Sequence, residues 1–232
     1  MTGLVFTDVS LFRNGTEILG PLDLRLDAVG ITCILGPNGA GKSVFLNLCH
    51  GMFAPERGTV CWNDQPAGTT RNERSFMFQS AAVMRRSVWA NVEFPLKAYG
   101  VARAERAARV ENALEFARLL GKAKQPAASL SGGEKQRMAL ARAWVTRPKV
   151  ILLDEPAANL DPGSTGALEE MLRNIAQDSG VMIATHDLPQ AQRLADHVLV
   201  FAEGKLVANS PASGFFGQNH TGHVANFLAG RI

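Results

Sequence analysis

Hydrophobic residues follow a strand-like pattern in the first and last parts of this chain and a helix-like pattern in its middle. Residues 22–27 alternate strictly between apolar and polar, as a strand with one face in water does, and Asn14-Gly15 before them is a strong hairpin signal. Unbroken apolar runs, typical of buried parallel strands, occupy residues 31–35, 150–153 and 181–184. Shorter strands are expected at residues 4–9, 59–62, 75–78, 198–201 and 205–207.

From about residue 80 to 145 the apolar positions recur at helical spacing. Ser87 is a suitable N-cap for a helix that runs to Tyr99, and residues 104–120 form a second expected helix that stops at Gly121. Beyond this stretch, helices are expected at residues 42–49, 162–177 and 224–228. Strand and helix therefore alternate on both sides of a helical insertion, which predicts an α/β fold.

Composition and charge narrow the classes of protein. The chain has 232 residues, of which 46% are hydrophobic and 19% charged, and its net charge of +3 comes from scattered lysines and arginines. This balance gives no argument for a nucleic-acid surface. The three cysteines, Cys33, Cys49 and Cys61, match no metal or disulfide spacing and predict reduced thiols in the cytoplasm. We expect no signal peptide, and no run approaches the about 18 apolar residues of a membrane helix. Any membrane association is therefore expected to pass through another protein.

A glycine-rich loop directly follows the apolar run at 31–35. Residues 36–43 read Gly-Pro-Asn-Gly-Ala-Gly-Lys-Ser, which is the G-x-x-x-x-G-K-S pattern of a phosphate cradle. Its glycines allow backbone N–H groups to turn towards an anion, and the helix after them adds the partial positive charge of its N-terminus. Lys42 can then reach the β- and γ-phosphates, and the Ser43 hydroxyl can bind Mg²⁺.

Two carboxylates follow the apolar run at 150–153. In an open parallel sheet, the carboxyl ends of the strands are where ligands bind. Beside a phosphate loop, Asp154 would hold Mg²⁺ and Glu155 would orient or deprotonate the attacking water. The alternative is a carboxylate that merely ends a strand.

Another predicted helix begins near residue 131 and has two glycines in its first turn, where glycine does not favour a helix. Ser131 and Glu134 form an S-x-x-E capping box, so a helix is predicted to begin there. Gly132 and Gly133 in its first turn lower helix stability. They are expected to leave the helix end sterically open as a second anion site.

With these motifs in this order, the chain resembles the ATP-binding cassette (ABC) ATPases over essentially its whole length. Residues 36–43 match the family's Walker A loop, 150–154 its Walker B strand, 130–134 its signature and 159–161 its D-loop. Gln79 matches the Q-loop glutamine, His186 the switch histidine, and Phe12 stands where an aromatic ring stacks on adenine, although a core phenylalanine is the alternative. Val44 departs from the family, since many members have Thr there.

The resemblance implies a set of site residues. Glu155, His186 and Lys42 would be catalytic, and Mg²⁺ would be held by Ser43, Gln79 and Asp154. ATP would contact Phe12, Gly36, Pro37, Asn38, Gly39, Ala40, Gly41, Lys42, Ser43, Val44, Gln79, Ser131, Gly132, Gly133, Glu134 and Asp161.

It also implies a fold and a domain organisation. The fold would be a P-loop NTPase core of mixed or parallel sheet, with an antiparallel β subdomain and an inserted helical subdomain. Residues 1–232 would form a single ABC ATPase domain, with the core and β subdomain in 1–79 and 146–232 and the helical subdomain in about 80–145.

The implied partners are a second ATPase subunit, most simply a second copy of this chain, in a head-to-tail dimer, and the permease of an importer. A solute-binding protein would act indirectly, and nucleic acid is not expected. The chain would sit on the inner face of the cell membrane through the permease. Local similarity to importers of oxyanions, in particular tungstate, lies in residues 48–51, 84–87 and 191–196. Importers of phosphate, molybdate or amino acids, a soluble ABC ATPase outside transport, and a non-catalytic nucleotide-binding regulator are the alternatives.

Overall fold

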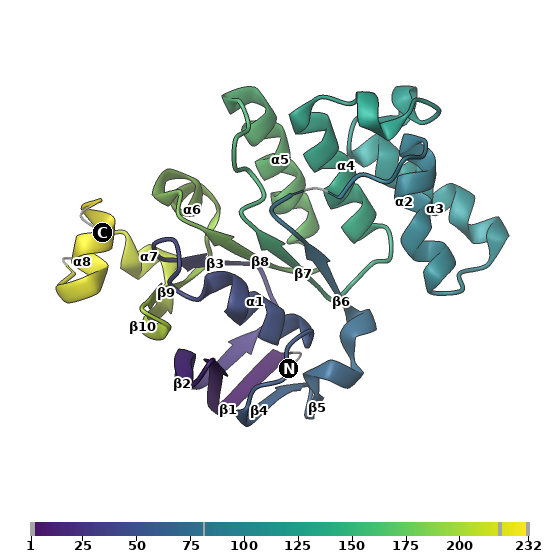
Figure 1. Ribbon diagram of the computed structural model, residues 1–232. Coiled ribbons are helices and arrows are strands. Elements are labelled where there is room, and N and C mark those ends of the chain that lie inside the picture. The colour runs from purple at the N-terminus through teal and green to yellow at the C-terminus, as the bar shows by residue number, and fades with distance from the viewer. Residues whose placement is uncertain (1–2, 81, 218–219, 231–232) are drawn as a thin grey trace.

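The computed structural model describes residues 3–80, 82–217 and 220–230. Its strands form two sheets, and helices cover the larger sheet on one side and lie between the two sheets on the other (Figure 1). The larger sheet has the order β10-β9-β3-β8-β7-β6, in which every pair is parallel except β9 with β10. Its strands are β3 (Ile31–Leu35), β6 (Arg74–Met77), β7 (Val150–Asp154), β8 (Gly180–Thr185), β9 (His197–Ala202) and β10 (Lys205–Pro211).

The smaller sheet is antiparallel and has the order β2-β1-β4-β5. Its strands are β1 (Gly3–Arg13), β2 (Thr16–Asp27), β4 (Arg57–Trp62) and β5 (Gln65–Pro66). Helix α1 (Lys42–His50) lies between the sheets (Figure 1). Its buried Phe45 contacts both of them. The Phe45 ring lies 5.2 Å from that of Phe6 in β1 and 4.9 Å from that of Phe201 in β9. Aromatic packing on both sides therefore fixes the helix that follows the glycine loop.

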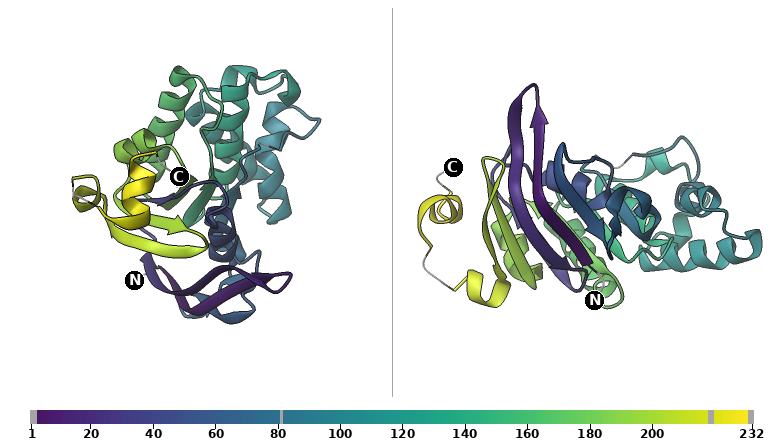
Figure 2. Two further views of the ribbon diagram at one scale, coloured as in Figure 1. Left: turned by 60° about the vertical axis from the view of Figure 1, so that its left-hand side comes forward. Right: turned by 90° about the horizontal axis from the view of Figure 1, so that it is seen from below.

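The helices of the middle segment lie together at one end of the molecule, and the C-terminal helix lies at the other (Figures 1 and 2). They are α2 (Val88–Ala98), α3 (Arg103–Phe116) and α4 (Gly132–Trp144), all between β6 and β7 in the chain. The other helices are α5 (Pro162–Ile175), α6 (Leu188–Leu194), α7 (Ala212–Phe215) and α8 (Gly222–Leu228). Short 3₁₀ turns occupy Ala67–Thr69, Arg71–Glu73, Leu120–Lys122 and Ala127–Ser129. The predicted α/β fold with an inserted helical segment is confirmed.

Strands β1, β2 and β10 are longer than predicted, and the predicted end of one helix is wrong. The second helix of the insertion ends at Phe116 and does not continue to residue 120. Leu119 N–H donates to the Leu114 carbonyl at 2.7 Å and Arg118 N–H to the Glu115 carbonyl at 2.9 Å, with Arg118 at φ +57°. This is a Schellman ending with an arginine in the left-handed position where glycine is usual. Gly121, the expected stop signal, therefore lies beyond the actual end.

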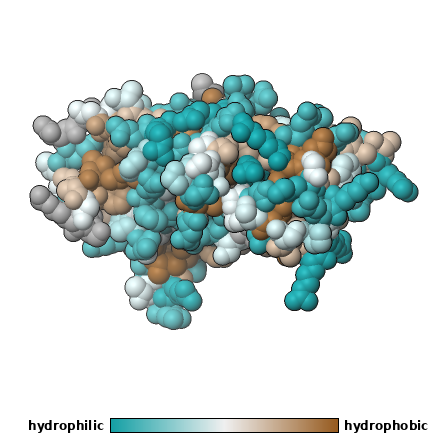
Figure 3. Space-filling view, turned by 90° about the horizontal axis from the view of Figure 1, so that it is seen from above, coloured by the Kyte–Doolittle hydropathy of each residue, from teal (hydrophilic) through white to brown (hydrophobic). Residues whose placement is uncertain are grey.

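Polar side chains cover most of the surface seen from above, and hydrophobic side chains gather there in separate patches (Figure 3). Among the described residues, no helix is both long and apolar enough to cross a membrane.

Candidate functional site

A pocket of about 460 Å³ opens where β3, β7 and β8 end. These three strands are neighbours and parallel, so the loops that leave their carboxyl ends meet at one edge of the sheet. The residues that line the pocket are Arg13, Ile18, Asn38, Gly39, Ala40, Gly41, Lys42, Ser43, Val44, Gln79, Asp154, Glu155 and His186. The structure thus brings together most of the loop, carboxylate, glutamine and histidine residues that the sequence predicts.

The backbone conformation of the loop at residues 36–41 requires glycine at three positions. Gly36 has φ +148°, and a Cβ there would lie 2.2 Å from the carbonyl oxygen of Phe201. Gly39 and Gly41 have φ of +83° and +100°, which a side chain would strain. Gly41 is the N-cap of α1 and supplies no side-chain hydrogen bond. Because the N–H groups in the first turn of a helix have no partner within it, those of α1 remain available to an anion in the pocket.

Lys42 crosses the loop from the start of α1. Its ammonium donates to the carbonyls of Gly36 at 2.7 Å and Pro37 at 3.0 Å, and it lies 3.9 Å from Oε1 of Glu155. Only 6% of Lys42 is exposed. Burial lowers the pKa of this lysine, and the nearby carboxylates of Glu155 and Asp154 oppose that shift. The structure thus holds a positive charge beside the free N–H groups.

Glu155 lies between Lys42 and His186. It follows β7 with φ +46°, a left-handed conformation that non-glycine residues rarely adopt, and its N–H donates to the Ala184 carbonyl at 2.9 Å. Its Oε1 lies 2.8 Å from Nδ1 of His186. Glu155 is buried, whereas 58% of the His186 side chain is exposed. A carboxylate held in this way between a lysine and an imidazole is suited to bind and deprotonate a water at the pocket mouth.

The second predicted anion site lies elsewhere. Ser131 caps α4 through the predicted capping box, with Glu134 N–H donating to Ser131 Oγ at 3.3 Å and Ser131 N–H to Glu134 Oε2 at 3.0 Å. Glu134 also accepts a hydrogen bond from Lys122, and these contacts, that of Lys122 foremost, lower the pKa of the Glu134 carboxyl. Residues 131–134 are not among the described residues that line the pocket. In one copy of the chain, the two anion sites are therefore separate.

The sequence profile of the ABC transporter family matches residues 19–158 of the chain. The chain belongs to this family. It is 33% identical over 231 residues to the Fe(3+) ions import ATP-binding protein FbpC of Pasteurella multocida, covering 97% of the chain and 66% of that relative. It is 41% identical over 208 residues to the molybdate/tungstate import ATP-binding protein WtpC of Archaeoglobus fulgidus, covering 85% of the chain and 84% of WtpC.

The fold agrees with this family. The structure of cbiO1 from Clostridium perfringens, part of the ABC transporter complex cbiONQ, superposes with a TM-score of 0.85 at 28% identity. The alignment covers 93% of this chain and 90% of cbiO1. Other relatives are named for import of methionine, tungstate and phosphate. The chain spans just under two thirds, 66%, of the FbpC relative.

The oxygen donors of the pocket fit a magnesium ion. Ser43, Gln79 and Asp154 all line the pocket and offer a hydroxyl, an amide and a carboxylate oxygen. Among the described residues there is no preformed group of three metal-binding His, Cys, Asp or Glu side chains. Mg²⁺ usually takes one or two protein carboxylates and completes its octahedron with water and phosphate oxygens, so one carboxylate beside a hydroxyl and an amide oxygen is a suitable donor set.

Phe12 does not line the pocket among the described residues, and its stacking role stays a prediction. It lies in β1 with 39% of its surface exposed, and its N–H donates to Glu56 at 3.1 Å. Arg13 and Ile18, on either side of the β1–β2 turn, reach the pocket instead. The hairpin signal at Asn14-Gly15 predicted the turn, but nothing in the sequence showed that its flanks approach the nucleotide loop.

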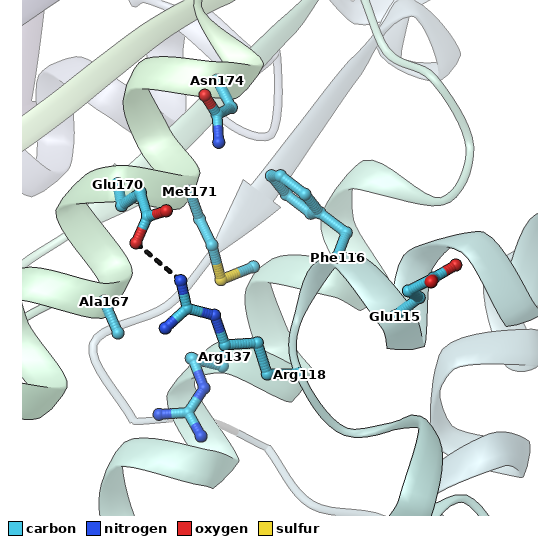
Figure 4. Close-up of a pocket in the computed structure, with 8 residues that line it drawn as sticks. All are labelled: Glu115, Phe116, Arg118, Arg137, Ala167, Glu170, Met171 and Asn174. Carbon is cyan, nitrogen blue, oxygen red and sulfur yellow. Dashed lines mark hydrogen bonds and ion pairs between the residues drawn. The ribbon is translucent and has the colours of Figure 1, made fainter.

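A smaller cavity of about 190 Å³ lies between the end of α3 and helices α4 and α5 (Figure 4). Arg118 and Glu170 form an ion pair across it at 2.9 Å, and Arg137 and Met171 complete its wall. No residue expected in the ATP site lines this cavity in the described part of the chain, so it is not a candidate for the reaction.

The two glycines of the signature have different roles. Gly132 is open, with no atom within 4 Å of an added Cβ, as expected. A Cβ on Gly133 would lie 2.2 Å from Oγ and 2.7 Å from Cβ of Ser164 in α5. Ser164 is held by Asp161, the N-cap of α5, through hydrogen bonds that lower the pKa of the Asp161 carboxyl. Gly133 therefore lets the signature helix approach the D-loop helix closely, which the sequence did not show.

We predict that Gly133→Ala destabilises the protein and Gly132→Ala does not. The first substitution forces α4 and α5 apart, at about 1–3 kcal/mol, whereas the second adds a methyl group in open space and is neutral or stabilising by up to about 1 kcal/mol. Urea denaturation of both variants measures the difference. Equal stabilities would show that the contact with Ser164 is not tight.

Proposed function

We propose that this chain is the ATP-hydrolysing subunit of an importer and that it works as a dimer on a membrane permease. The observation that carries the proposal is the arrangement of Lys42, Glu155 and His186 around the glycine-loop pocket, with Glu155 Oε1 3.9 Å from Lys42 and 2.8 Å from His186. We also propose that residues 1–232 form one ABC ATPase domain, with residues 80–145 as its helical subdomain.

Each residue of the pocket has its own role in the proposed hydrolysis. The N–H groups of residues 39 and 41–44 and the Lys42 ammonium bind the phosphates, and Lys42 exchanges its bonds to the Gly36 and Pro37 carbonyls for phosphate oxygens. Glu155 accepts a proton from the attacking water, and His186 keeps that carboxylate oriented. Mg²⁺, held by Ser43, Gln79 and Asp154, supplies charge neutralisation on the phosphates when bound. At Val44 the backbone N–H still donates, although the hydroxyl of the more usual Thr is missing.

The signature supports a head-to-tail dimer. Ser131 and the α4 terminus lie outside the pocket of their own chain, and Gly132 leaves that terminus sterically open. A helix N-terminus with a serine at its cap and two glycines in its first turn suits a phosphate. We propose that this phosphate belongs to ATP that is bound in the pocket of a second copy of the chain. The residues on this side of each shared site would be Ser131, Gly132, Gly133, Glu134 and Asp161, while Phe12 would stack on the adenine held by its own chain.

The proposed solute is an oxyanion such as tungstate, delivered by a solute-binding protein to the permease. The 41% identity to WtpC over 84% of that relative supports this choice. The deciding experiment is ATPase activity of the complex with its permease and binding protein. Tungstate or molybdate is expected to stimulate hydrolysis, and stimulation by iron, methionine or phosphate alone would replace the solute and leave the importer function intact.

We propose that the permease docks beside residues 84–87, which places the chain on the inner face of the membrane. Arg85 and Arg86 are exposed at this surface, and Phe94 and Phe78 are 47% and 53% exposed. Trp89 is partly buried and packs against the core. Trp89 therefore contributes to the core of the helical segment, while the exposed Phe94 stays available to a partner. Aromatic residues and arginine are both enriched at protein interfaces.

Lys42→Ala is expected to lower ATP hydrolysis by at least about 100-fold and to weaken ATP binding, because it removes the one lysine among the described residues that line the pocket. Lys205→Ala, at an exposed position on β10, is the matched control and should hydrolyse ATP normally. Normal turnover by Lys42→Ala would contradict the assignment of the phosphate cradle.

Glu155→Gln should bind ATP but lose about 10²- to 10⁴-fold in hydrolysis, since an amide is a poor base. With ATP and Mg²⁺ the variant is expected to accumulate as a dimer, measured by light scattering after size exclusion. Glu203→Gln, an exposed glutamate in the β9–β10 turn, is the control. A Glu155→Gln monomer that still turns over would remove both the base and the dimer from the mechanism.

Met84→Glu and Arg86→Glu should weaken permease binding by about 2 kcal/mol or more, because a negative charge replaces an apolar or a positive contact. ATP hydrolysis by the isolated chain should change little. Arg103→Glu, an exposed charge reversal at the start of α3, should assemble normally. Binding to permease in detergent measures the effect, and normal assembly of both variants would place the docking site elsewhere.

A further inference from the structure

The segment between β6 and α2 runs from the ATP pocket to the proposed docking surface. Gln79, at its start, lines the pocket, and Met84 and Arg86, near its end, lie at the docking surface. Hydrogen bonds from buried or partly buried side chains of α2 and α4 hold this segment at several points. We therefore expect the backbone of this segment to move together with α2 and α4.

At its docking end the segment is held by Asn91 of α2, which is fully buried. The Asn91 amide accepts from Met84 N–H at 2.9 Å and donates to the carbonyls of Met84 at 3.1 Å and Ser87 at 2.9 Å. It also lies 3.4 Å from the carbonyl of Arg86. One side chain thus determines the backbone course of the docking surface.

At its pocket end the segment is held by α4, the signature helix. Gln136 Nε2 donates to the Gln79 carbonyl at 3.2 Å, and Arg142 donates to the Ala82 carbonyl at 2.6 Å. Gln136 lies five positions after Ser131, at the start of the same helix. The contact between Gln136 and Gln79 therefore joins the ATP pocket of a chain to the signature that the chain offers to its partner.

The side-chain amide of Gln136 does not contribute favourably to the stability of the fold. Only 7% of the residue is exposed, and its Oε1 is buried with no hydrogen-bond partner among the described residues. A buried acceptor without a donor destabilises a fold, so an apolar side chain of the same length would serve packing better. What the amide provides is its N–H bond to Gln79.

We infer that Gln136 is a positioning residue that couples ATP binding in the pocket to the movement of the docking segment together with the signature helix. When ATP contacts the Gln79 side chain, the Gln79 backbone moves. The hydrogen bond from Gln136 to the Gln79 carbonyl then moves α4 with it. Arg142 and Asn91 keep residues 82–87 in step with the helices. The inference rests on the proposed ATP site, but it does not depend on the solute or on the identity of the permease. A claim of coupling requires a direct measurement at both ends.

Hydrogen–deuterium exchange of the full chain, in the Glu155→Gln background so that ATP persists, measures both ends at once. Without further substitution, ATP and Mg²⁺ are expected to slow exchange in residues 36–45 and 82–90. Gln136→Met should keep the protection of 36–45 and lose that of 82–90. Gln136→Glu, which keeps the shape but has no N–H, should do the same. Gln190→Met, which removes another buried glutamine amide at 1% exposure, is the control and should keep both.

The outcomes separate the two levels of the proposal. Absence of ATP protection at 36–45 in the parent would contradict the ATP site itself. Protection of 82–90 that survives Gln136→Met would overturn the coupling role alone, as would a Gln136 variant that loses both protections. In the complex with its permease, Gln136→Met should lower hydrolysis stimulated by the transported solute about tenfold, with basal hydrolysis and KM for ATP within about twofold. An equal loss of basal and stimulated rates would mean that Gln136 is merely structural.

Discussion

Parallel pairing of β3, β8 and β7 is the constraint on which the rest of this structure depends. Each strand ends beside the pocket and contributes some of its residues. The glycine loop follows β3, Asp154 and Glu155 lie at the end of β7, and His186 follows β8. The chain distance from Lys42 to His186 is large, yet the sheet brings both within reach of one glutamate. Phe45 then fixes α1 between the sheets, so that its first-turn N–H groups stay aimed at the pocket.

Many features were predictable from the sequence because they are local. The apolar runs, the glycine loop, the Ser87 cap and the Ser131–Glu134 capping box all follow from short-range rules, and each is present in the structure. Asp154 and Glu155 were predicted at this edge because ligands bind at the carboxyl ends of parallel strands, whereas His186 was assigned through the family resemblance.

What the sequence did not show depends on contacts between distant segments. Arg118 takes a left-handed conformation that a glycine rule cannot anticipate. The closeness of Gly133 to Ser164, and the bonds from Asn91 and Gln136 to the segment after β6, require the packing of helices that no pattern specifies. In the same way, the approach of Arg13 and Ile18 to the pocket depends on how one sheet sits against the other.

The central claim is that each ATP site is completed by a second copy of the chain. The most direct measurement is a crystal structure of the Glu155→Gln variant with ATP and Mg²⁺. The account predicts ATP bound to Lys42 and residues 36–43 of one copy, with its phosphates also contacted by Ser131 and the α4 terminus of the other. ATP bound with Ser131 of both copies facing solvent, or Lys42 still bonded to the Gly36 and Pro37 carbonyls, would contradict it.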